Sequence, residues 1–401
     1  MRVLIAYRYF LPDTPAYAAI LGNISFWLAE AGHDVEVITA QPAYKPNANI
    51  PKQVWRETMN GVDVRRVRLF KEKGMGLAKA VNYALFILRS FLIILFGPRR
   101  DVIMAGTTPP VLQGWFLSLA AKVRGSEFIY HMQDIHPEIV SFNDGKMVKG
   151  ASFNLFQCMD SATNKRATAN IVIGNDMRDV LIERGANPVD VKVIRNFAVN
   201  SERTDSLTQR SKDKAVRFVF AGNIGVFQNL ENLVLVFGQL DPTKVTLVLV
   251  GEGRAKKNLI QLVKNQDIKN VEFHAHMSEG DVFNFLCDQD VGLVSLLPGL
   301  YKYAFPSKIW TYIAADLPML SIVEDESGIA KFLKSNNFGE SVNWQSSQED
   351  MVKTILAMVV KVKSGEYSMT TRKQLYHSSA AQRHWVDLFD SIRLKQEEKS
   401  Y

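Results

Sequence analysis

Two short apolar runs in the C-terminal half of the chain each end at a glycine. Phe218–Ala221 and Thr246–Val250 are rich in Val, Phe and Leu, which is typical of buried strands in a parallel sheet. After the first glycine turn, apolar residues return at helical spacing, at positions 230, 233, 234 and 237, and Leu259, Leu262 and Val263 follow the second. The pattern therefore predicts strand, glycine turn and helix, twice in succession.

The N-terminal half shows the same alternation of strand-like and helix-like segments. A strand at Val3–Ala6 precedes a helix with apolar residues at 20, 24, 27 and 28, and a second strand follows at Val35–Thr39. Further strands are predicted at 62–69, 101–105, 128–132, 170–174 and 191–195. This order predicts an α/β domain with a parallel sheet over residues 1–200.

A polar, charge-mixed segment at 201–214 separates this domain from a second α/β domain, which we place at 215–378. Later strands of that domain are predicted at 271–274, 291–294 and 319–323, with helices between them. A final helix at 379–396 carries apolar residues at helical spacing, including Trp385 and Phe389. A chain of 401 residues is long enough for two such domains.

The most apolar segment, Tyr83–Gly97, has 15 residues and contains Arg89, so it is shorter than the roughly 20 residues that a membrane span requires. One interpretation is a buried helix. The other is a helix lying in a membrane surface, because the region 52–100 is also the most basic part of the chain. Residues 1–200 hold 24 Lys and Arg against 17 Asp and Glu, and the second half is balanced. The basic residues nearest the apolar segment are Lys71, Lys73, Lys79, Arg99 and Arg100.

The absence of familiar motifs argues against two classes of function. The first loop, residues 8–18, lacks the G-x-G-x-x-G pattern of NAD or FAD sites. The basic region lacks interleaved aromatic residues and familiar nucleic-acid motifs, so we expect no nucleic-acid partner.

Cys158 and Cys287 are far apart in sequence, which predicts buried thiols in a reducing compartment. No signal peptide is recognised at Met1, so a cytoplasmic location is expected.

The glycine turns carry the candidate chemistry. Four glycines at the predicted carboxyl ends of the two strands would expose backbone N–H groups at helix N-termini, where ligands of open α/β sheets bind. These are Gly222, Gly225, Gly251 and Gly253. Arg254, Lys256 and Lys257 follow directly. N–H groups and cations together suit a diphosphate, so the sequence predicts a nucleotide-sugar site here.

Motifs along nearly the whole chain resemble family 4 glycosyltransferases of the GT-B fold, and most closely the bacterial branch that adds N-acetylfucosamine or a related sugar to O-antigen or capsule. They include GHDVEVIT at 32–39, DVIMAGTTPP at 101–110, QDIHPE at 133–138, VIRN at 193–196, AGNIGVFQNLENL at 221–233, VGEG at 250–253 and PSKIWTYIAADLP at 306–318. The resemblance implies two facing Rossmann-like domains with a cleft between them. It also implies that the final helix packs back on the first domain.

The resemblance implies a set of donor-binding residues in the second domain. Lys308 would reach the donor diphosphate, Ser307 would cap the helix start, and Arg254 would follow the GEG turn at 251–253. The remaining members are Asn223, Gln228, Glu252, Thr311 and Glu326, together with the four glycines. The family's usual pair of glutamates would fall at Tyr303 and Thr311, where neither residue is acidic. Thr311 or Glu326 would then have to hold the ribose hydroxyls, and we expect Glu326 to open the helix that begins at 328.

The acceptor side is expected in the first domain. His131 and Asp134 flank the end of a predicted strand. Asp134 would accept the proton of the acceptor hydroxyl or cap the next turn, and His131 would assist or hydrogen-bond the donor sugar. Glu138 would contact a sugar hydroxyl or pair with an arginine.

The resemblance implies a retaining, metal-independent transferase without a bound cofactor. It would move a sugar, such as an N-acetylated hexosamine or deoxyhexose, from UDP to a polyprenyl-diphosphate-linked saccharide at the cytoplasmic face of the inner membrane. Two alternatives remain open at this stage. One is a nucleotide-sugar 2-epimerase of the same fold, and the other is a non-catalytic assembly subunit, which the missing glutamates favour.

Overall fold

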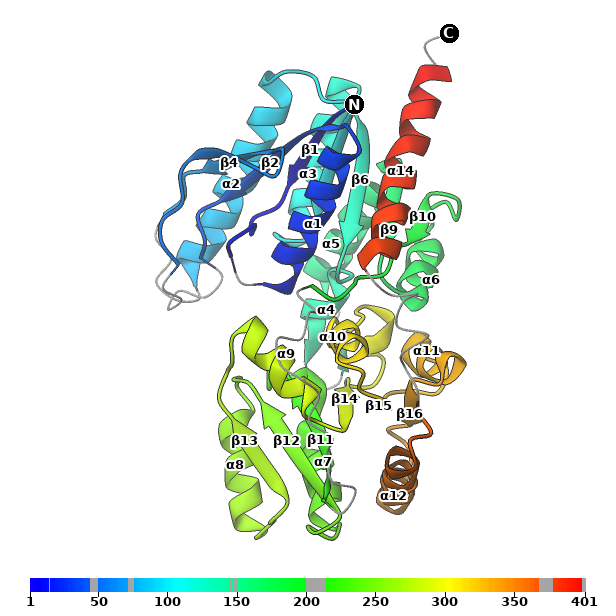
Figure 1. The fold of residues 1–401 in the computed structure, drawn as a ribbon. Coiled ribbons are helices and arrows are strands. Elements are labelled where there is room, and N and C mark those ends of the chain that lie inside the picture. Colours follow the sequence, from blue (N-terminus) through cyan, green and yellow to red (C-terminus); the bar gives the residue numbers. More distant parts are fainter. Residues whose placement is uncertain are drawn as a thin grey trace. The chain divides into compact units, whose positions relative to one another are not determined.

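The computed structural model of the protein describes residues 1–13, 15–43, 50–70, 76–143, 146–147, 150–199, 214–367 and 378–398. The chain forms two compact units (Figure 1). Unit 1 comprises residues 1–142, 147–196 and 379–401, and unit 2 comprises residues 143–146 and 197–378. Most of the predicted linker, together with Lys71 and Lys73 of the basic region, lies outside the described residues.

Unit 1 is built on an eight-stranded sheet with the order β10-β9-β6-β5-β1-β2-β4-β3. Neighbouring strands are parallel except at the β3–β4 pair. The strands are β1 (Arg2–Ala6), β2 (Asp34–Ala40), β3 (Arg56–Met59), β4 (Val62–Val67), β5 (Val102–Gly106), β6 (Glu127–Met132), β9 (Ala169–Val172) and β10 (Val191–Val193). A two-stranded ladder joins β7 (Phe142–Asn143) to β8 (Lys146–Met147).

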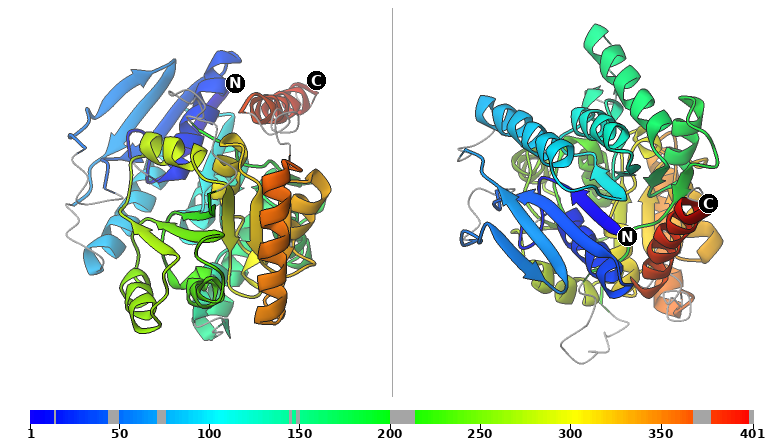
Figure 2. Two further views of the ribbon diagram at one scale, coloured as in Figure 1. Left: turned by 60° about the horizontal axis from the view of Figure 1, so that its bottom comes forward. Right: turned by 90° about the horizontal axis from the view of Figure 1, so that it is seen from above.

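Helices cover both faces of this sheet, as the central strands require because they are apolar on both sides. The helices α1 and α14 lie on one face, and α2, α3 and α5 lie on the other (Figures 1 and 2). Their bounds are α1 (Ala16–Glu30), α2 (Leu77–Phe96), α3 (Leu112–Arg124), α4 (Glu138–Ser141), α5 (Ala151–Arg166), α6 (Asn175–Glu183) and α14 (Ser378–Glu398).

Unit 2 contains a six-stranded parallel sheet with the order β13-β12-β11-β14-β15-β16. The strands are β11 (Val216–Ala221), β12 (Val245–Val250), β13 (Val271–His274), β14 (Val291–Ser295), β15 (Met319–Ile322) and β16 (Gly339–Val342). The helical segments are η1 (Val226–Gln228), α7 (Leu230–Gly238), α8 (Lys256–Asn265), α9 (Glu279–Cys287), η2 (Leu300–Lys302), α10 (Lys308–Ala314), α11 (Gly328–Asn336) and α12 (Gln348–Ser364). Apolar residues of β11, β12, α7 and α12 pack together in one buried cluster.

One hairpin in unit 1 was not predicted from the sequence. The strand expected at 62–69 ends at Val67, and β3 pairs with it in antiparallel register. Asn60 and Gly61 join the two strands, both with positive φ, of 47° and 79°. Asn-Gly is the preferred pair for a two-residue hairpin turn because both positions need positive φ, so this dipeptide was the signal that the prediction missed.

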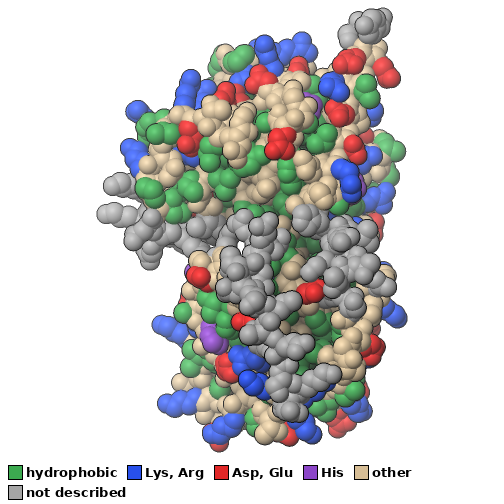
Figure 3. Space-filling view, in the orientation of Figure 1, with side chains coloured by type: hydrophobic (Ala, Val, Ile, Leu, Met, Phe, Trp, Pro, Cys, Tyr) green, Lys and Arg blue, Asp and Glu red, His purple; other side chains and the backbone are tan. Residues whose placement is uncertain are grey.

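Helix α2 is longer than the apolar segment from which it was predicted. It begins at Leu77 and has 20 residues, so the argument that the segment is too short to span a membrane was wrong. By length and composition α2 could cross a membrane. Only 28% of its most apolar 18 residues is buried in the protein, so α2 is not a mostly buried core helix. Its polar residues Asn82 and Ser90 lie on the buried side, and Asn82 forms two hydrogen bonds of 2.9 Å with the backbone of Phe70. Figure 3 shows Lys and Arg side chains, in blue, at the upper left of the molecule, over the part that Figure 1 draws in blue and light blue.

The two cysteines are also placed differently from the prediction. Cys158 is exposed on α5 and Cys287 is half-buried at the end of α9, so the expectation that both are buried was wrong. Neither is in a disulfide.

The last helix, α14, belongs to unit 1 although the chain reaches it through unit 2. Its buried face consists of Ala381, Trp385, Phe389 and Ile392. Phe389 packs beside His33, with ring centroids 5.9 Å apart, and Gln382 donates to Glu30 at the end of α1. The helix therefore supplies part of the core of unit 1.

We predict that Phe389→Ala lowers the free energy of unfolding by about 3–5 kcal/mol, the usual cost of truncating a fully buried Phe. Leu394→Ala, on the same helix but 55% exposed, is the matched control and should change it by less than about 0.5 kcal/mol. Urea unfolding monitored by circular dichroism measures both. Equal effects of the two substitutions would contradict the packing of α14 on unit 1.

Candidate functional site

The two glycine turns of unit 2 touch each other through backbone atoms. A Cβ on Gly251 would lie 2.0 Å from the Gly222 oxygen, and one on Gly253 would lie 2.1 Å from the Ile224 oxygen. Gly222 and Gly251 also have φ of 133° and 135°, which L residues rarely adopt. Hydrogen bonds of 2.9 Å from Gly222 N to Val250 O and from Ile224 N to Glu252 O complete the contact. Only glycine fits these positions, and the two turns form one rigid edge.

Gln228 shapes the first of these turns. Its Oε1 accepts from Gly225 N at 3.1 Å, and its backbone oxygen accepts from the Ser295 hydroxyl at the end of β14. Gly222 and Asn223 are exposed beside it. Gln228 therefore holds the turn, whereas Asn223 is accessible to a ligand.

Lys308 places a cation at this edge. Its Nζ lies 3.1 Å from the centroid of the Phe220 ring, and a Cβ on Gly222 would lie 3.7 Å from it. Burial lowers the pKa of Lys308 well below its usual value. Among the residues that the structure describes, the ammonium has neither a hydrogen-bond acceptor nor an ion-pair partner. A partly buried cation without a partner, next to a glycine turn, is suited to bind an anion.

The start of α10 holds Lys308 through packing rather than through a side-chain cap. Ser307 occupies the N-cap position, but its hydroxyl makes no capping hydrogen bond, contrary to our expectation. Trp310 stacks on Phe305 with ring centroids 5.7 Å apart. The Tyr312 hydroxyl accepts from Ala221 N at 3.1 Å and donates toward Val219 O at 3.2 Å, so it joins α10 to β11. Thr311 is half-buried on the same helix.

Lys256 does not take the ligand-binding position that its sequence context suggested. Its Nζ donates to Gly251 O at 2.8 Å, to His274 O at 3.0 Å and to Glu252 Oε1 at 2.7 Å. These bonds use all three donors of the ammonium. Lys256 therefore joins the ends of β12 and β13 and engages Glu252, while Arg254 is the accessible cation of the GEG turn.

The helix after β15 is capped by Ser327 and not by Glu326. The Ser327 hydroxyl accepts from Ala330 N at 3.1 Å. Glu326 is exposed, and its Oε1 accepts from the Tyr301 hydroxyl at 3.4 Å. The expectation that Glu326 opens α11 was wrong, because Ser at the N-cap satisfies a helix N–H directly.

In unit 1, His131 is at the end of β6 and is enclosed by protein. Its Nδ1 lies 2.7 Å from the Tyr17 hydroxyl and its Nε2 lies 3.0 Å from Gln133 Nε2. Trp385 of α14 packs on the ring with a centroid distance of 4.8 Å. Burial lowers the pKa of His131 to about 3, so the imidazole is neutral near pH 7. Both ring nitrogens are engaged, so a role at a substrate would require one of these contacts to open.

Asp134 differs from its neighbour. Burial raises the pKa of its carboxyl to about 6. The part of the chain that the structure describes offers it no side-chain hydrogen bond and no cation. A carboxylate whose pKa is near the working pH is suited to take and return a proton, so Asp134 is the better base of the two.

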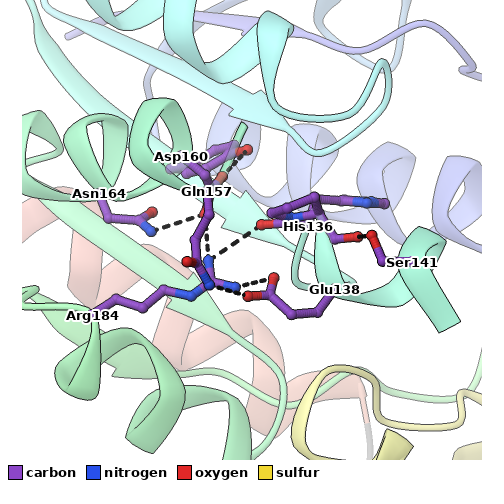
Figure 4. Close-up of polar contacts among 9 residues, drawn as sticks. His136, Glu138, Ser141, Gln157, Asp160, Asn164 and Arg184 are labelled. Atoms are coloured by element: carbon purple, nitrogen blue, oxygen red, sulfur yellow. Dashed lines mark hydrogen bonds and ion pairs between the residues drawn. The ribbon is translucent and has the colours of Figure 1, made fainter. Parts of the chain in front are cut away.

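Glu138 is paired with Arg184, the second of the alternatives considered from the sequence. Figure 4 shows the Arg184 side chain between Glu138 and Asp160. Arg184 Nη1 also donates to His136 O at 3.2 Å, and Gln157 Nε2 donates to Glu138 Oε1 at 2.7 Å. All three charged groups are nearly inaccessible. The cluster fixes the loop 134–138 after β6.

The role of Arg184 was not predicted from the sequence, because this residue lies 46 or more positions beyond the loop that it holds and follows an ordinary amphipathic helix. The donor-side residues all belong to unit 2, and His131, Asp134 and Glu138 all belong to unit 1. Within the described ranges there is no group of three His, Cys, Asp or Glu residues that could hold a metal ion.

Comparisons with known proteins are consistent with this geometry. Residues 17–196 match the family described as "Glycosyl transferase 4-like domain". The chain is 24% identical over 262 residues to the probable glycosyltransferase WbjE of Pseudomonas aeruginosa, covering 63% of this chain and 64% of that relative. It is 24% identical over 332 residues to the putative colanic acid biosynthesis glycosyl transferase WcaI of Escherichia coli K12, covering 78% of this chain and 81% of that relative. The chain thus spans just under two thirds of the first relative.

Solved structures share the whole fold. HepE of Anabaena, solved in complex with UDP, has a TM-score of 0.67 at 15% identity, over 98% of this chain and 100% of that one. Sucrose-phosphate synthase of Thermosynechococcus elongatus has a TM-score of 0.75 at 14% identity, over 98% of this chain and 99% of that one. The fold is therefore GT-B, as predicted.

We predict that Asp134→Asn stabilises the protein more at pH 7.5 than at pH 5. The folded-state pKa of about 6 is above the usual 3.8, so the folded protein binds this proton more tightly than the unfolded chain. The stability that this group contributes is present at low pH and is lost as the pH rises through 6. Asparagine removes that loss. Urea unfolding at both pH values measures the difference.

Asp179→Asn is the matched control for this prediction, because it removes an exposed carboxylate from α6 in the same unit. Its effect should be similar at the two pH values. If Asp134→Asn changed stability equally at pH 5 and pH 7.5, the raised pKa of Asp134 would be wrong.

Proposed function

We propose that this protein is a glycosyltransferase that moves a sugar from a UDP-sugar to a lipid-linked saccharide during synthesis of a bacterial surface polysaccharide. The observation that carries the proposal is the Lys308 ammonium, which lies beside Gly222 without a partner among the described residues. The 4-like domain over residues 17–196 and the relatives named as glycosyltransferases support the reaction class. HepE, whose structure contains UDP, supports the choice of nucleotide.

Transfer breaks the bond between the anomeric carbon and the diphosphate oxygen, and negative charge develops on the leaving diphosphate. In the proposed mechanism Lys308 stabilises that charge, as a metal ion does in other enzymes. The acceptor hydroxyl loses a proton, either to Asp134 or to the leaving phosphate oxygen. We propose that the reaction is metal-independent and retains the anomeric configuration, and that the transferred sugar is an N-acetylated hexosamine or deoxyhexose such as N-acetylfucosamine.

We predict that UDP raises the unfolding temperature of the wild-type protein and that EDTA does not reverse this. At a hundredfold excess over Kd, the added stability is about 2.7 kcal/mol. Lys308→Met should abolish the UDP effect. Without nucleotide it should be at least as stable as the wild type, because burial depresses the lysine pKa and methionine carries no charge to desolvate. Thermal unfolding with and without UDP measures both effects.

Lys264→Met is the control, because Lys264 is exposed on α8 of the same unit. It should keep the full UDP effect. An unchanged response of Lys308→Met to UDP would contradict the assigned site. Incubation of UDP-N-acetylglucosamine without acceptor tests the epimerase alternative, since epimerisation needs no acceptor and transfer does. Absence of binding by UDP, GDP and dTDP would favour a non-catalytic subunit.

The proposed location is the cytoplasmic face of the inner membrane, bound through α2. One side of this helix presents exposed apolar residues at intervals of four or seven positions: Leu77, Val81, Leu88, Leu92 and Phe96. Phe116 and Val123 of the neighbouring α3 are exposed as well. Lys79, Lys122 and Arg99 lie on the same two helices or just after them. An apolar stripe flanked by cations suits a helix lying in an anionic membrane surface.

We predict that the protein sediments with vesicles containing anionic lipid and that Leu88→Ser with Leu92→Ser weakens this binding more than tenfold. Burying each leucine in the membrane contributes roughly 1.5–3 kcal/mol, so two losses exceed that factor. Ile260→Ser, at an exposed apolar residue of α8 in unit 2, is the control and should bind as the wild type does. A wild-type protein that stays in the supernatant with such vesicles would refute the membrane proposal.

A further inference from the structure

Glu324 follows β15 at the same carboxyl edge of the sheet as Lys308 and the glycine turns. Its Oε1 accepts from Gly299 N at 2.5 Å, which fixes the carboxylate against the loop after β14. Its Oε2 is buried and has no hydrogen-bond partner in the part of the chain that the structure describes. A carboxylate oxygen accepts up to two hydrogen bonds, and a buried one without any is costly. Such an atom is suited to accept from a donor that the described residues do not supply.

The two acids that follow Glu324 are different. Asp325 is exposed and its Oδ2 accepts from Asn343 at 3.1 Å. Glu326 is exposed and accepts from the Tyr301 hydroxyl at 3.4 Å. Of these three consecutive acids, Glu324 alone combines a fixed orientation with a buried oxygen that lacks a donor.

Lys308 and Glu324 carry opposite charges at one edge of the sheet, yet no ion pair joins them within residues 214–367. The strand order explains their separation. Lys308 lies over Phe220 of β11, and Glu324 follows β15, which is two strands away. At about 4.8 Å between strands, the two strands are about 10 Å apart. This arrangement suits a ligand with an anionic group at one end and hydroxyl donors about 10 Å away.

We propose that Glu324 is a donor-binding residue whose Oε2 accepts hydrogen bonds from hydroxyl groups of the nucleotide sugar while Lys308 binds its diphosphate. This inference rests on the proposed function. The hydroxyl groups belong either to the ribose or to the transferred sugar, since both flank a diphosphate. Glu324 thereby supplies the carboxylate that the sequence lacks at Tyr303 and Thr311, in place of the substitutes Thr311 and Glu326 suggested by the sequence alone.

The test compares Glu324→Gln with the wild type by calorimetry, using UDP, 2′,3′-dideoxy-UDP and UDP-N-acetylglucosamine. Glutamine keeps an oxygen for Gly299 N and places an amide donor where Oε2 was. Asp325→Asn is the matched control, because it makes the same change of charge at the next residue, which is exposed. It should bind all three ligands as the wild type does.

If Glu324 binds the ribose, Glu324→Gln weakens UDP at least tenfold and leaves dideoxy-UDP unchanged. If it binds the transferred sugar, UDP is unchanged and UDP-N-acetylglucosamine is weakened at least tenfold. Wild-type affinity of Glu324→Gln for all three ligands overturns the proposal, as does an equal loss for UDP and dideoxy-UDP accompanied by no further loss for UDP-N-acetylglucosamine. Glu324→Ala, which removes both oxygens, must show the same ligand preference and serves if the glutamine variant does not fold.

The proposed function fails in a different way. A wild-type protein that binds none of the three ligands refutes the nucleotide-sugar site, and the role of Glu324 with it. A wild-type protein that binds UDP through Lys308, with Glu324→Gln behaving as the wild type, refutes only the role of Glu324.

Discussion

The backbone contact between the turns after β11 and β12 is the constraint on which the candidate donor site depends. Gly251 and Gly253 are packed so closely against Gly222 and Ile224 that a single methyl group would overlap a carbonyl oxygen. Because the turns meet without side chains between them, the Lys308 ammonium can lie beside Gly222. The N–H groups of Gly222, Gly225 and Gly251 donate within the protein, so the prediction that these glycines expose their N–H groups was wrong. The cation remains there at a cost in stability, since burial opposes its charge. A site built in this way is organised before its ligand arrives.

The two units hold their candidate residues by different means. In unit 2 the site is held by backbone contacts and by packing. Trp310 of α10 stacks on Phe305, and Lys256 donates to backbone oxygens at the ends of β12 and β13. In unit 1 the loop after β6 is held by a buried group of charges around Arg184 (Figure 4). Removing one member of a buried charge group leaves the others unpaired, so such groups tolerate little change. Glu138 belongs to this group, whereas burial raises the pKa of Asp134, four residues earlier in the sequence.

The sequence was most informative where one local pattern determines the outcome. Apolar runs ending at glycine located β11 and β12, and the motifs as a set predicted the GT-B fold that the solved structures confirm. It was least informative where distant residues decide. The pairing of Arg184 with Glu138, and the three bonds that occupy Lys256, follow from tertiary contacts and leave no trace in local spacing. Helix α2 begins six residues before the apolar segment at 83–97. Its first turns include Asn82, which is buried through hydrogen bonds to Phe70 that no periodicity encodes.

The position of α14 has a consequence for biosynthesis. Its residues Trp385 and Phe389 fill the core of unit 1, yet they are translated after the whole of unit 2. Domains of a nascent chain usually fold in the order in which they emerge. Here the order is interrupted, because the first unit lacks part of its core until the ribosome has finished the second. During that interval the face that α14 will cover exposes His33 and the neighbouring apolar residues to solvent and to chaperones. Unit 2, whose residues from 197 to 378 form one continuous stretch, is thus the first part of the protein that can complete its fold.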